Sequence, residues 1–143
     1  MVKTGSFARG VDIKDELGDA PLITASAFGL EEVVVALIEA GADINVQGNE
    51  GGTPLYVASQ QGHVELVKGL LRGGAAVNQA AKKGSSPLFV ASQQGHLEVA
   101  RGLLKSGADP TLVADNGATA LGRARHFGRT RIVQLLQEHG ATI

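Results

Sequence analysis

The sequence repeats itself at a fixed interval. The stretches "TPLYVASQQGHVELVKGLLRGGA" (53–75) and "SPLFVASQQGHLEVARGLLKSGA" (86–108) are identical at 15 of 23 aligned positions. A fixed period of this length indicates a repeat architecture, in which each short unit buries its apolar face only against its neighbours. The same step of 33 connects a leucine series and a glycine series: Leu22, Leu55, Leu88 and Leu121; Gly29, Gly62, Gly95 and Gly128.

Each unit reads as two short helices followed by a turn. Thr-Pro and Ser-Pro pairs predict a first helix that begins near Pro54 and Pro87, because the hydroxyl caps free N–H groups and proline fits the first helical position. Gly62 and Gly95 are expected to end that helix, and apolar residues at helical spacing then predict an antiparallel second helix. Left-handed helix caps are predicted at Gly74 and Gly107. The Asn- and Gly-rich stretch that follows, such as "ADINVQGNEGG", predicts a tight turn that projects between repeats.

These features together resemble the ankyrin repeat, which has a period of 33 and the signature T-P-L-H-x-A. The signature reads "APLITA", "TPLYVA", "SPLFVA" and "TALGRA" here. The resemblance covers residues 15–143 and implies an all-α solenoid of stacked antiparallel helix pairs, joined by β-turn or hairpin loops. It implies one domain with four repeats, at 15–47, 48–80, 81–113 and 114–143.

The two ends of the stack raise separate questions, since a linear stack exposes an apolar face unless a cap covers it. In the fourth repeat Gln137 and Arg123 replace apolar or uncharged residues of the earlier repeats, which predicts a C-terminal cap. At the start, "GVDIKDELGDAP" is similar to "GADINVQGNEGGTP" with two residues missing. Residues 1–14 are therefore either an irregular N-terminal cap or the remnant of a preceding repeat.

Two repeats depart from the family pattern at matching positions. Gly69 and Gly102 stand in the second helix where the family usually has leucine, and Tyr56 and Phe89 stand where it has histidine. A glycine inside a helix costs about 1 kcal/mol relative to alanine. We hypothesise that each aromatic ring fills the volume that the missing side chain leaves.

Composition and motifs argue against several function classes. The net charge of −1 and pI near 6.4 disfavour binding to nucleic acid or an anionic membrane surface, and the lack of cysteine excludes disulfides and zinc–thiolate sites. Neither an apolar run long enough to cross a membrane nor a secretory signal is apparent, so a cytoplasmic or nuclear location is expected. Phosphate-loop and nucleophile-elbow motifs are missing, so we expect neither an enzyme nor a cofactor or metal site.

Histidine and asparagine recur with the same period. His63 and His96 lie one helix layer apart, about 8–10 Å, which is too far for two ligands of one zinc ion. We expect them to hydrogen-bond a helix start or a turn. Asn45 and Asn78 precede the turns, where ankyrin asparagines are hydroxylated in some animals, although bonding of the local backbone is the simpler interpretation.

The resemblance also indicates where a partner would bind. In ankyrin-type stacks the turn tips and the first-helix surfaces face one concave side, on which partner proteins usually dock. Carried over by position, the candidate binding residues are Glu16, Asp19, Asn49, Glu50, Lys82, Lys83, Ser85, Asp115 and Asn116 at the tips, with Leu17 beside them, and Phe28, Gln60, Gln61, Gln93, Gln94, His126 and Phe127 on the first helices.

Charge is separated along the chain. Residues 15–47 hold seven acidic and no basic side chains, whereas residues 81–113 and 114–143 each carry a net charge of +2. These charges are either ordinary solvated surface or the complement of a partner, or second copy, with the reverse gradient. Phe28 and Phe127 are candidate anchors for a partner, or are buried beneath their own turns.

The sequence as a whole predicts a non-enzymatic module that binds another protein on its concave face. The alternative is a structural spacer, a fragment of a larger protein or an engineered repeat scaffold without a native partner. The near-identity of the second and third repeats favours a recent duplication or a design. We expect a monomer, with weak head-to-tail self-association as the other option. Nothing in the sequence identifies the partner.

Overall fold

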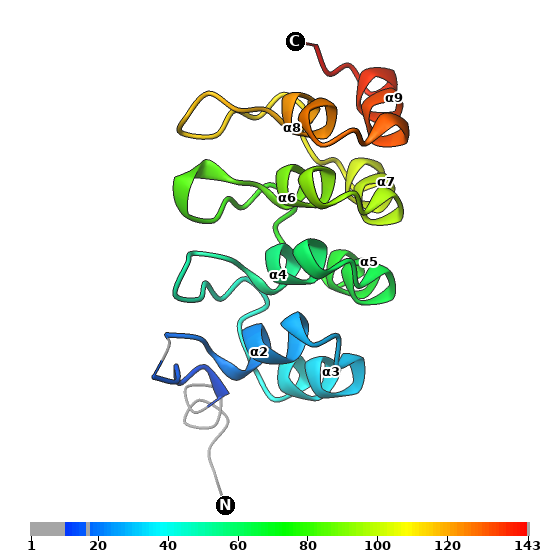
Figure 1. Cartoon of the computed structure of the whole chain (residues 1–143). Coiled ribbons are helices and arrows are strands. Elements are labelled where there is room, and N and C mark those ends of the chain that lie inside the picture. The colour runs from blue at the N-terminus through cyan, green and yellow to red at the C-terminus, as the bar shows by residue number, and fades with distance from the viewer. Residues whose placement is uncertain (1–10, 17, 143) are drawn as a thin grey trace, which may run out of the picture.

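The computed structural model describes residues 11–16 and 18–142, which form a stack of helix pairs (Figure 1). Within these residues the secondary structure is helical, apart from one isolated bridge between Val113 and Thr119. The predicted all-α repeat fold is therefore confirmed. The pairs are α2 (Pro21–Ala27) with α3 (Glu31–Glu39), α4 (Pro54–Gln61) with α5 (Val64–Arg72), α6 (Pro87–Gln94) with α7 (Leu97–Lys105), and α8 (Ala120–His126) with α9 (Thr130–Glu138); a short 3₁₀ helix, η1 (Lys82–Gly84), lies between α5 and α6.

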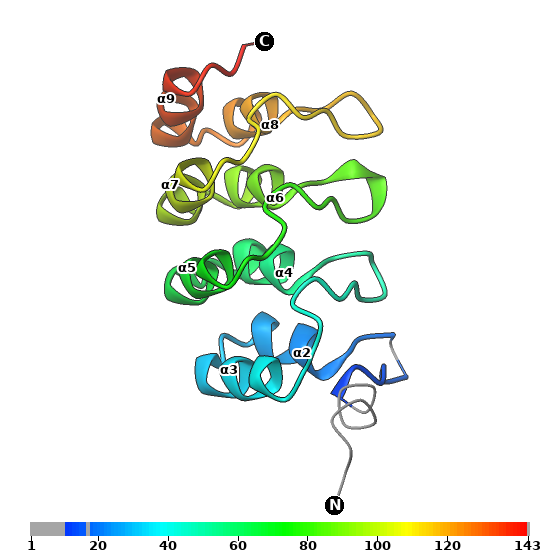
Figure 2. The ribbon, with the colours of Figure 1, turned by 180° about the vertical axis from the view of Figure 1, so that it is seen from behind.

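The helices lie in two layers. The first helix of each pair packs on the first helix of the next, which makes an inner layer of α2, α4, α6 and α8. The second helices form the outer layer, and loops project from the inner layer to the opposite side, as seen from both directions in Figures 1 and 2. We call these projecting loops the fingers.

The inner helices begin where the sequence predicts. The hydroxyl of Thr53 accepts a hydrogen bond from the backbone N–H of Tyr56, and that of Ser86 accepts one from Phe89, each at 3.1 Å. Thr119 caps α8 in the same way, through the N–H of Gly122 at 3.0 Å. These caps fix the starts of α4, α6 and α8, each worth about 1 kcal/mol. In the first repeat Ala20 occupies the cap position and provides no such bond.

Gly62 and Gly95 end the inner helices, as predicted, with φ of 81° and 83°. A second reason for glycine at position 62 is that the imidazole of His96 packs against it. A Cβ atom there would lie 2.6 Å from Cε1 of that ring. The left-handed conformation and the close approach of the next repeat both exclude a side chain at this position.

Hydrogen bonds from each repeat to the preceding one accompany that approach. His63 Nε2 lies 2.9 Å from the carbonyl oxygen of Ala27, and His96 Nε2 lies 3.0 Å from that of Gln60. In the fourth repeat Arg129 replaces histidine and donates through Nε to the carbonyl of Gln93 at 3.2 Å. The histidines therefore have the structural, hydrogen-bonding role expected from the sequence, but the groups that they bond are carbonyls at the ends of the preceding inner helices and not a helix start.

The apolar core runs through the whole stack. The leucine series is almost fully buried, and an alanine of each inner helix packs beside it, so inner helices approach closely. Each buried leucine contributes about 2 kcal/mol through removal of apolar surface from water. The residues of these series are Leu22, Leu55, Leu88 and Leu121, with Ala25, Ala58, Ala91 and Ala124.

Backbone hydrogen bonds close the fingers and join them to one another. Within a finger, for example, the N–H of Ala81 donates to the carbonyl of Ser85 at 2.8 Å. Between fingers, the N–H of Lys82 donates to the carbonyl of Glu50 at 2.9 Å, and the same distance separates Asp115 N from Lys83 O. The fingers thus form a connected row on one side of the stack.

The sequence comparison predicted that the segment before α2 lacks two residues relative to the segment before α4, and this prediction is wrong. Asp12 accepts a hydrogen bond from the N–H of Asp43, 31 residues later, and Asn45 makes the equivalent bond to Ala76 at the same separation. Asp12 therefore occupies the position that Asn45 has one repeat later, without a deletion. The rest of the question about residues 1–14 falls on residues 1–10, outside the described part of the chain.

The expected local role of the asparagines is also wrong. The side-chain oxygen of Asn45 accepts from Ala76, and that of Asn78 from Asp109, each at 2.9 Å and in the following repeat. A side chain in one unit thus satisfies the backbone of the next unit.

Tyr56 does not fill space left by Gly69, so that hypothesis is wrong. A Cβ atom added at Gly69 or at Gly102 would have no neighbour within 4 Å, which means that both glycines face open space on the outer layer. The ring of Tyr56 lies instead on the finger side, where its Cδ1 is 2.9 Å from a Cβ placed at Gly52.

The C-terminal end differs in part from expectation. Gln137 of α9 is exposed, whereas Leu104, the equivalent residue of α7, is buried. Arg123, however, does not cover the end of the stack. It lies half-buried on the finger side of α8 and hydrogen-bonds to α6.

Candidate protein-binding groove

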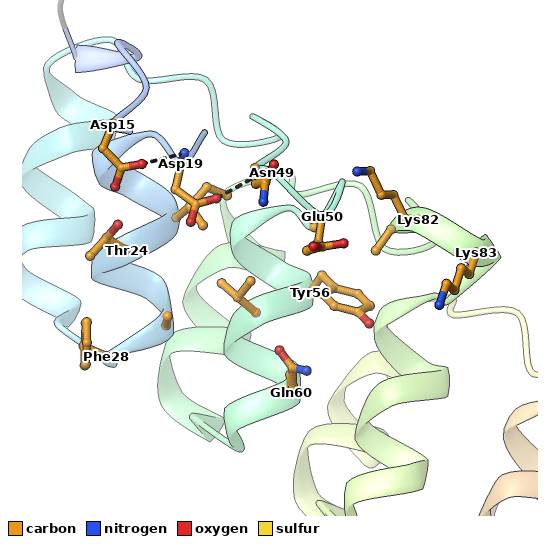
Figure 3. A pocket seen from close by; sticks show the side chains of 16 residues that line it. Asp15, Asp19, Thr24, Phe28, Asn49, Glu50, Tyr56, Gln60, Lys82 and Lys83 are labelled. Carbon is orange, nitrogen blue, oxygen red and sulfur yellow. Dashed lines mark hydrogen bonds between the residues drawn. The ribbon is translucent and has the colours of Figure 1, made fainter. Parts of the chain in front are cut away.

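A groove runs along the stack between the inner helices and the fingers. Its first hollow, of about 660 Å³, is lined by α2, α4 and the fingers on either side of α4. Figure 3 shows Tyr56 and Gln60 of α4 facing this hollow, with Asp19, Glu50 and Lys82 at its finger side. The inner surface is thus hollowed where consecutive repeats meet.

A second hollow, of about 460 Å³, lies further along the same side. It shares Tyr56, Lys82 and Lys83 with the first hollow, and it adds Phe89 of α6 and Arg123 of α8. We call the two hollows together the inner groove. It extends from the first repeat to the fourth.

Hydrogen bonds shape the acidic start of the groove. The carboxylate of Asp15 accepts a hydrogen bond from the N–H of Asp19 at 3.0 Å, and the carboxylate of Asp19 accepts one from the N–H of Asn49 at the same distance (Figure 3). Two adjacent fingers are joined through Asp19. These acidic residues therefore have a structural role as well as carrying charge.

Side chains of the second hollow are also held in place. The hydroxyl of Tyr56 donates to Ser85 Oγ at 3.2 Å, which links α4 to the next finger. Arg123 donates through Nε to Gln93 Oε1 at 3.1 Å, and its Cζ lies 5.2 Å from the centre of the Phe127 ring. A cation near an aromatic face is attracted by the ring, which restrains the guanidinium further.

The finger between these hollows contains strained backbone. Lys83 has φ of 67° and ψ of 14°, and among the non-glycine residues that the structure describes it alone has a positive φ. This left-handed conformation costs about 1–2 kcal/mol for a residue with a Cβ atom. Residues in such conformations concentrate at functional sites.

The charge separation seen in the sequence follows the groove. Asp15, Asp19 and Glu50 line the first hollow, and Arg123 lines the second. Lys82 and Lys83 lie between them and border both. In the described part of the chain the ion pairs are those of Lys68 with Glu65 and Arg101 with Glu98, on the outer helices.

Most of the candidate residues predicted from the sequence meet in this groove. Those that line a hollow are Asp19, Phe28, Asn49, Glu50, Gln60, Lys82, Lys83, Ser85, Gln93, Asp115 and Asn116. Others are exposed but line neither hollow, namely Glu16, Gln61, Gln94, His126 and Phe127. Leu17 lies outside the described residues.

The two phenylalanines are not buried beneath their turns. Phe28 is 71% exposed and Phe127 is 43% exposed. Phe28 lines the first hollow (Figure 3), whereas Phe127 packs edge-on against His126, with ring centres 4.8 Å apart. The alternative of buried rings is therefore wrong for both residues.

Sequence reasoning missed several residues of the groove, and three of them have large side chains at the second hollow. Tyr56, Phe89 and Arg123 line the second hollow but were assigned to packing or to the end of the stack. The signal was present, since the first two replace the usual histidine of the signature and Arg123 replaces a small or apolar residue. At these three positions the departure from the repeat pattern marks a side chain that lines the groove.

Comparison with protein families decides the assignment of the fold. A family model described as ankyrin repeats (3 copies) matches residues 4–81, 22–114 and 73–143. The chain belongs to the ankyrin repeat family. Ankyrin repeats are generally protein–protein interaction modules and are typically not enzymes. No curated protein matches this chain.

Metal ligands and membrane spans are two further features that bear on what the ankyrin stack could do. Within residues 11–16 and 18–142, no group of three or more histidine, aspartate or glutamate side chains is placed to hold a metal ion. None of the described helices is both long and apolar enough to cross a membrane. What the groove offers is hydrogen bonding, aromatic contact and charge.

Proposed function

We propose that this chain is a non-enzymatic recognition module that binds a partner protein in the inner groove. The observation that carries the proposal is that the groove is lined by side chains that the stack does not need for its own core. Tyr56, Gln60 and Phe89 are only partly buried, whereas the leucines behind them are buried completely. These positions are free to vary for recognition while the repeats keep their packing.

Rigidity supports the same proposal. The fingers are joined by backbone hydrogen bonds, and the inner helices are joined by His63, His96 and Arg129. A binding surface that is already ordered loses little conformational entropy when a partner docks. Less of the favourable free energy of the contacts is then offset by ordering of the binding surface, so the affinity is higher.

The groove is acidic near the first repeat and basic near the third and fourth. This distribution favours a partner whose own charges run the other way, basic where it meets the first repeat and acidic where it meets the third and fourth. Complementary fields speed encounter and fix orientation. Binding should therefore weaken as ionic strength rises, because salt screens exposed charges.

A display experiment tests the proposal directly. Random 12-residue peptides on phage would be selected against the wild-type chain, and the recovered peptides would be measured against two variants. The groove variant is Gln60→Ala/Lys83→Ala/Gln93→Ala, and the outer-face variant, a control that has the same number of substitutions and removes more charge, is Lys68→Ala/Arg72→Ala/Lys105→Ala. We expect binding to the outer-face variant to equal wild type and binding to the groove variant to fall at least tenfold. Equal binding to both variants would mean that the groove is not the recognition surface, as for a structural spacer.

A further inference from the structure

We propose that the second hollow receives an acidic side chain, glutamate or aspartate, from an extended segment of the partner. This inference rests on the proposed function, because it names the chemistry of the segment that the groove would bind. The elements that form the site are Lys82 and Lys83 on one finger, Arg123 on α8, and the rings of Tyr56 and Phe89.

The second hollow has a positively charged lining. Three cationic side chains line the hollow, and Asp115 is the one carboxylate among its lining residues. In the described part of the chain Lys82, Lys83 and Arg123 take part in no ion pair. The hollow therefore carries an excess of positive charge that no carboxylate of the described chain neutralises by direct contact.

The side chain of Arg123 is held in a fixed orientation. Its Nε donates to Gln93, and Phe127 lies beside the guanidinium, so the group is oriented before any partner arrives. No other hydrogen bond from this guanidinium occurs within the described residues. The two terminal nitrogens can therefore donate to one carboxylate in the bidentate geometry that arginine favours.

Two aromatic rings also line the second hollow. Tyr56 and Phe89 are half-buried and line the same hollow as the cationic residues, and the hydroxyl of Tyr56 is fixed on Ser85. Apolar surface beside a cation favours an occupant that carries an apolar group next to its carboxylate. A segment in which leucine or an aromatic residue adjoins the acidic residue fits this lining.

The opposite end of the groove sets the length of the segment. Asp19 and Glu50 line the first hollow, between the first and second repeats, and Arg123 lies between the third and fourth. Two helix layers separate these places, about 16–20 Å at 8–10 Å per layer. An extended chain covers about 3.3 Å per residue, so a basic residue of the segment should stand about five or six positions from the acidic one.

Peptide selection tests this inference. The probe is a library of random 12-residue peptides displayed at the N-terminus of a phage coat protein, so that no peptide has a free carboxyl terminus. We expect the enriched peptides to share an acidic residue beside an apolar one, with Lys or Arg five or six positions away. A synthetic peptide of the enriched sequence, capped at both ends, would then be titrated against the chain by calorimetry.

Paired variants assign the contact. Arg123→Gln should weaken the peptide about tenfold or more, since a charge-assisted hydrogen bond is lost, and Arg123→Lys should restore only part of the affinity because the bidentate geometry is lost. Lys105→Gln on α7 removes the same charge from the outer face and should leave the Kd unchanged. Replacing the acidic residue of the peptide by its amide should weaken wild type about tenfold but have little further effect on Arg123→Gln, which separates a direct contact from a misfolded variant.

Other outcomes are distinguishable. Enriched peptides without an acidic residue, or a Kd that Arg123→Gln leaves unchanged while the groove variant abolishes binding, would overturn this inference and leave the proposed function standing. Peptides that bind the groove variant as tightly as wild type would overturn both.

Discussion

Three serine hydroxyls are completely buried in the inner helices without a hydrogen-bond partner in the described part of the chain. They belong to Ser26, Ser59 and Ser92, which occupy the same position in three successive repeats. A buried hydroxyl that makes no hydrogen bond loses its solvation without compensation. We therefore expect these serines to lower the free energy of unfolding, and alanine at the same positions to raise it.

Ser59→Ala and Ser92→Ala are accordingly expected to stabilise the protein, each by about 1 kcal/mol. Each substitution removes an unsatisfied hydroxyl, and alanine has a higher helix propensity than serine. Urea unfolding followed by circular dichroism measures the change. Gln94→Ala, at an exposed position of α6, controls for helix propensity alone and should have a smaller effect. Destabilisation by Ser59→Ala would indicate that its hydroxyl is satisfied in solution.

Asp109 has a lowered pKa. The hydroxyl of Thr111 donates to its carboxylate at 2.6 Å, and the N–H of Thr111 donates at 2.9 Å, and both bonds favour the charged form. Because the pKa is lower in the folded state, the stability that these bonds contribute is present above the ordinary pKa of aspartate. It is lost as the pH falls through the folded pKa.

Thr111→Val removes the hydroxyl bond and should raise the pKa of Asp109 toward its ordinary value. Titration of the carboxyl carbon by NMR measures this directly. Thr111→Ser keeps a hydroxyl and is expected to keep the pKa low. A pKa that is the same in Thr111→Val and wild type would show that the hydroxyl bond does not form in solution.

The first inner helix is the least well supported of the four. Ala20 provides no cap for α2, whereas Thr53, Ser86 and Thr119 cap α4, α6 and α8. The outer helix of the same repeat, α3, exposes Val33 and Val35 and packs less closely on its outer neighbour than α5 does on α7. The first repeat should therefore open before the central ones.

Ala20→Ser supplies the missing hydroxyl and is expected to stabilise the protein by about 0.5–1 kcal/mol. Hydrogen exchange measured by mass spectrometry should show slower exchange in α2 and no change in α6. Ser86→Ala provides the converse test, with a loss of stability at α6. Unchanged exchange in α2 would mean that the N–H of Ile23 keeps its bond to the carbonyl of Ala20 and gains nothing from the hydroxyl.

Helix boundaries were largely predictable from the sequence, whereas the direction of side chains was not. Pro54 and Gly62 impose local backbone requirements, so α4 could be placed from the residues themselves. The location of the Tyr56 ring depends on which side of α4 the fingers occupy. The orientation of the Arg123 side chain depends on a hydrogen bond to Gln93, 30 residues away. These side-chain orientations are set by packing between repeats, and the pattern of residues within one repeat does not specify that packing.

The same distinction holds for the groove. Positions at the tips and on the inner helices were predicted because repeat geometry fixes them. The gap wrongly expected near Asp12 arose because Gly10-Val-Asp-Ile matches Gly41-Ala-Asp-Ile at an offset of 31, whereas the hydrogen bond from Asp43 places Asp12 at the position of Asn45, an offset of 33. The first finger also keeps this step, because the N–H of Asp15 donates to the carbonyl of Asp19 as that of Gly48 does to the carbonyl of Gly52.

The stack as a whole separates two tasks. Leucine, alanine and glycine at the repeat interval hold the units together, while the residues between them form the inner groove. Charge changes from acidic to basic along that groove, which gives a bound segment a preferred direction. The outer layer has a smaller hollow of about 300 Å³ between α5 and α7. Substitutions there serve as controls for those in the inner groove. Its lining residues are Lys68, Leu71, Arg72, Gly102, Lys105 and Ser106.

The most direct measurement is an NMR titration of the ¹⁵N-labelled chain with a selected 12-residue peptide. If the inner groove is the recognition surface, the largest amide shift changes will fall on Gly52, Tyr56, Gln60, Lys82, Ser85 and Gln93, and those of Gly69 and Gly102 will remain small. Largest changes on the outer helices α5 and α7, with the groove residues unmoved, would contradict the account.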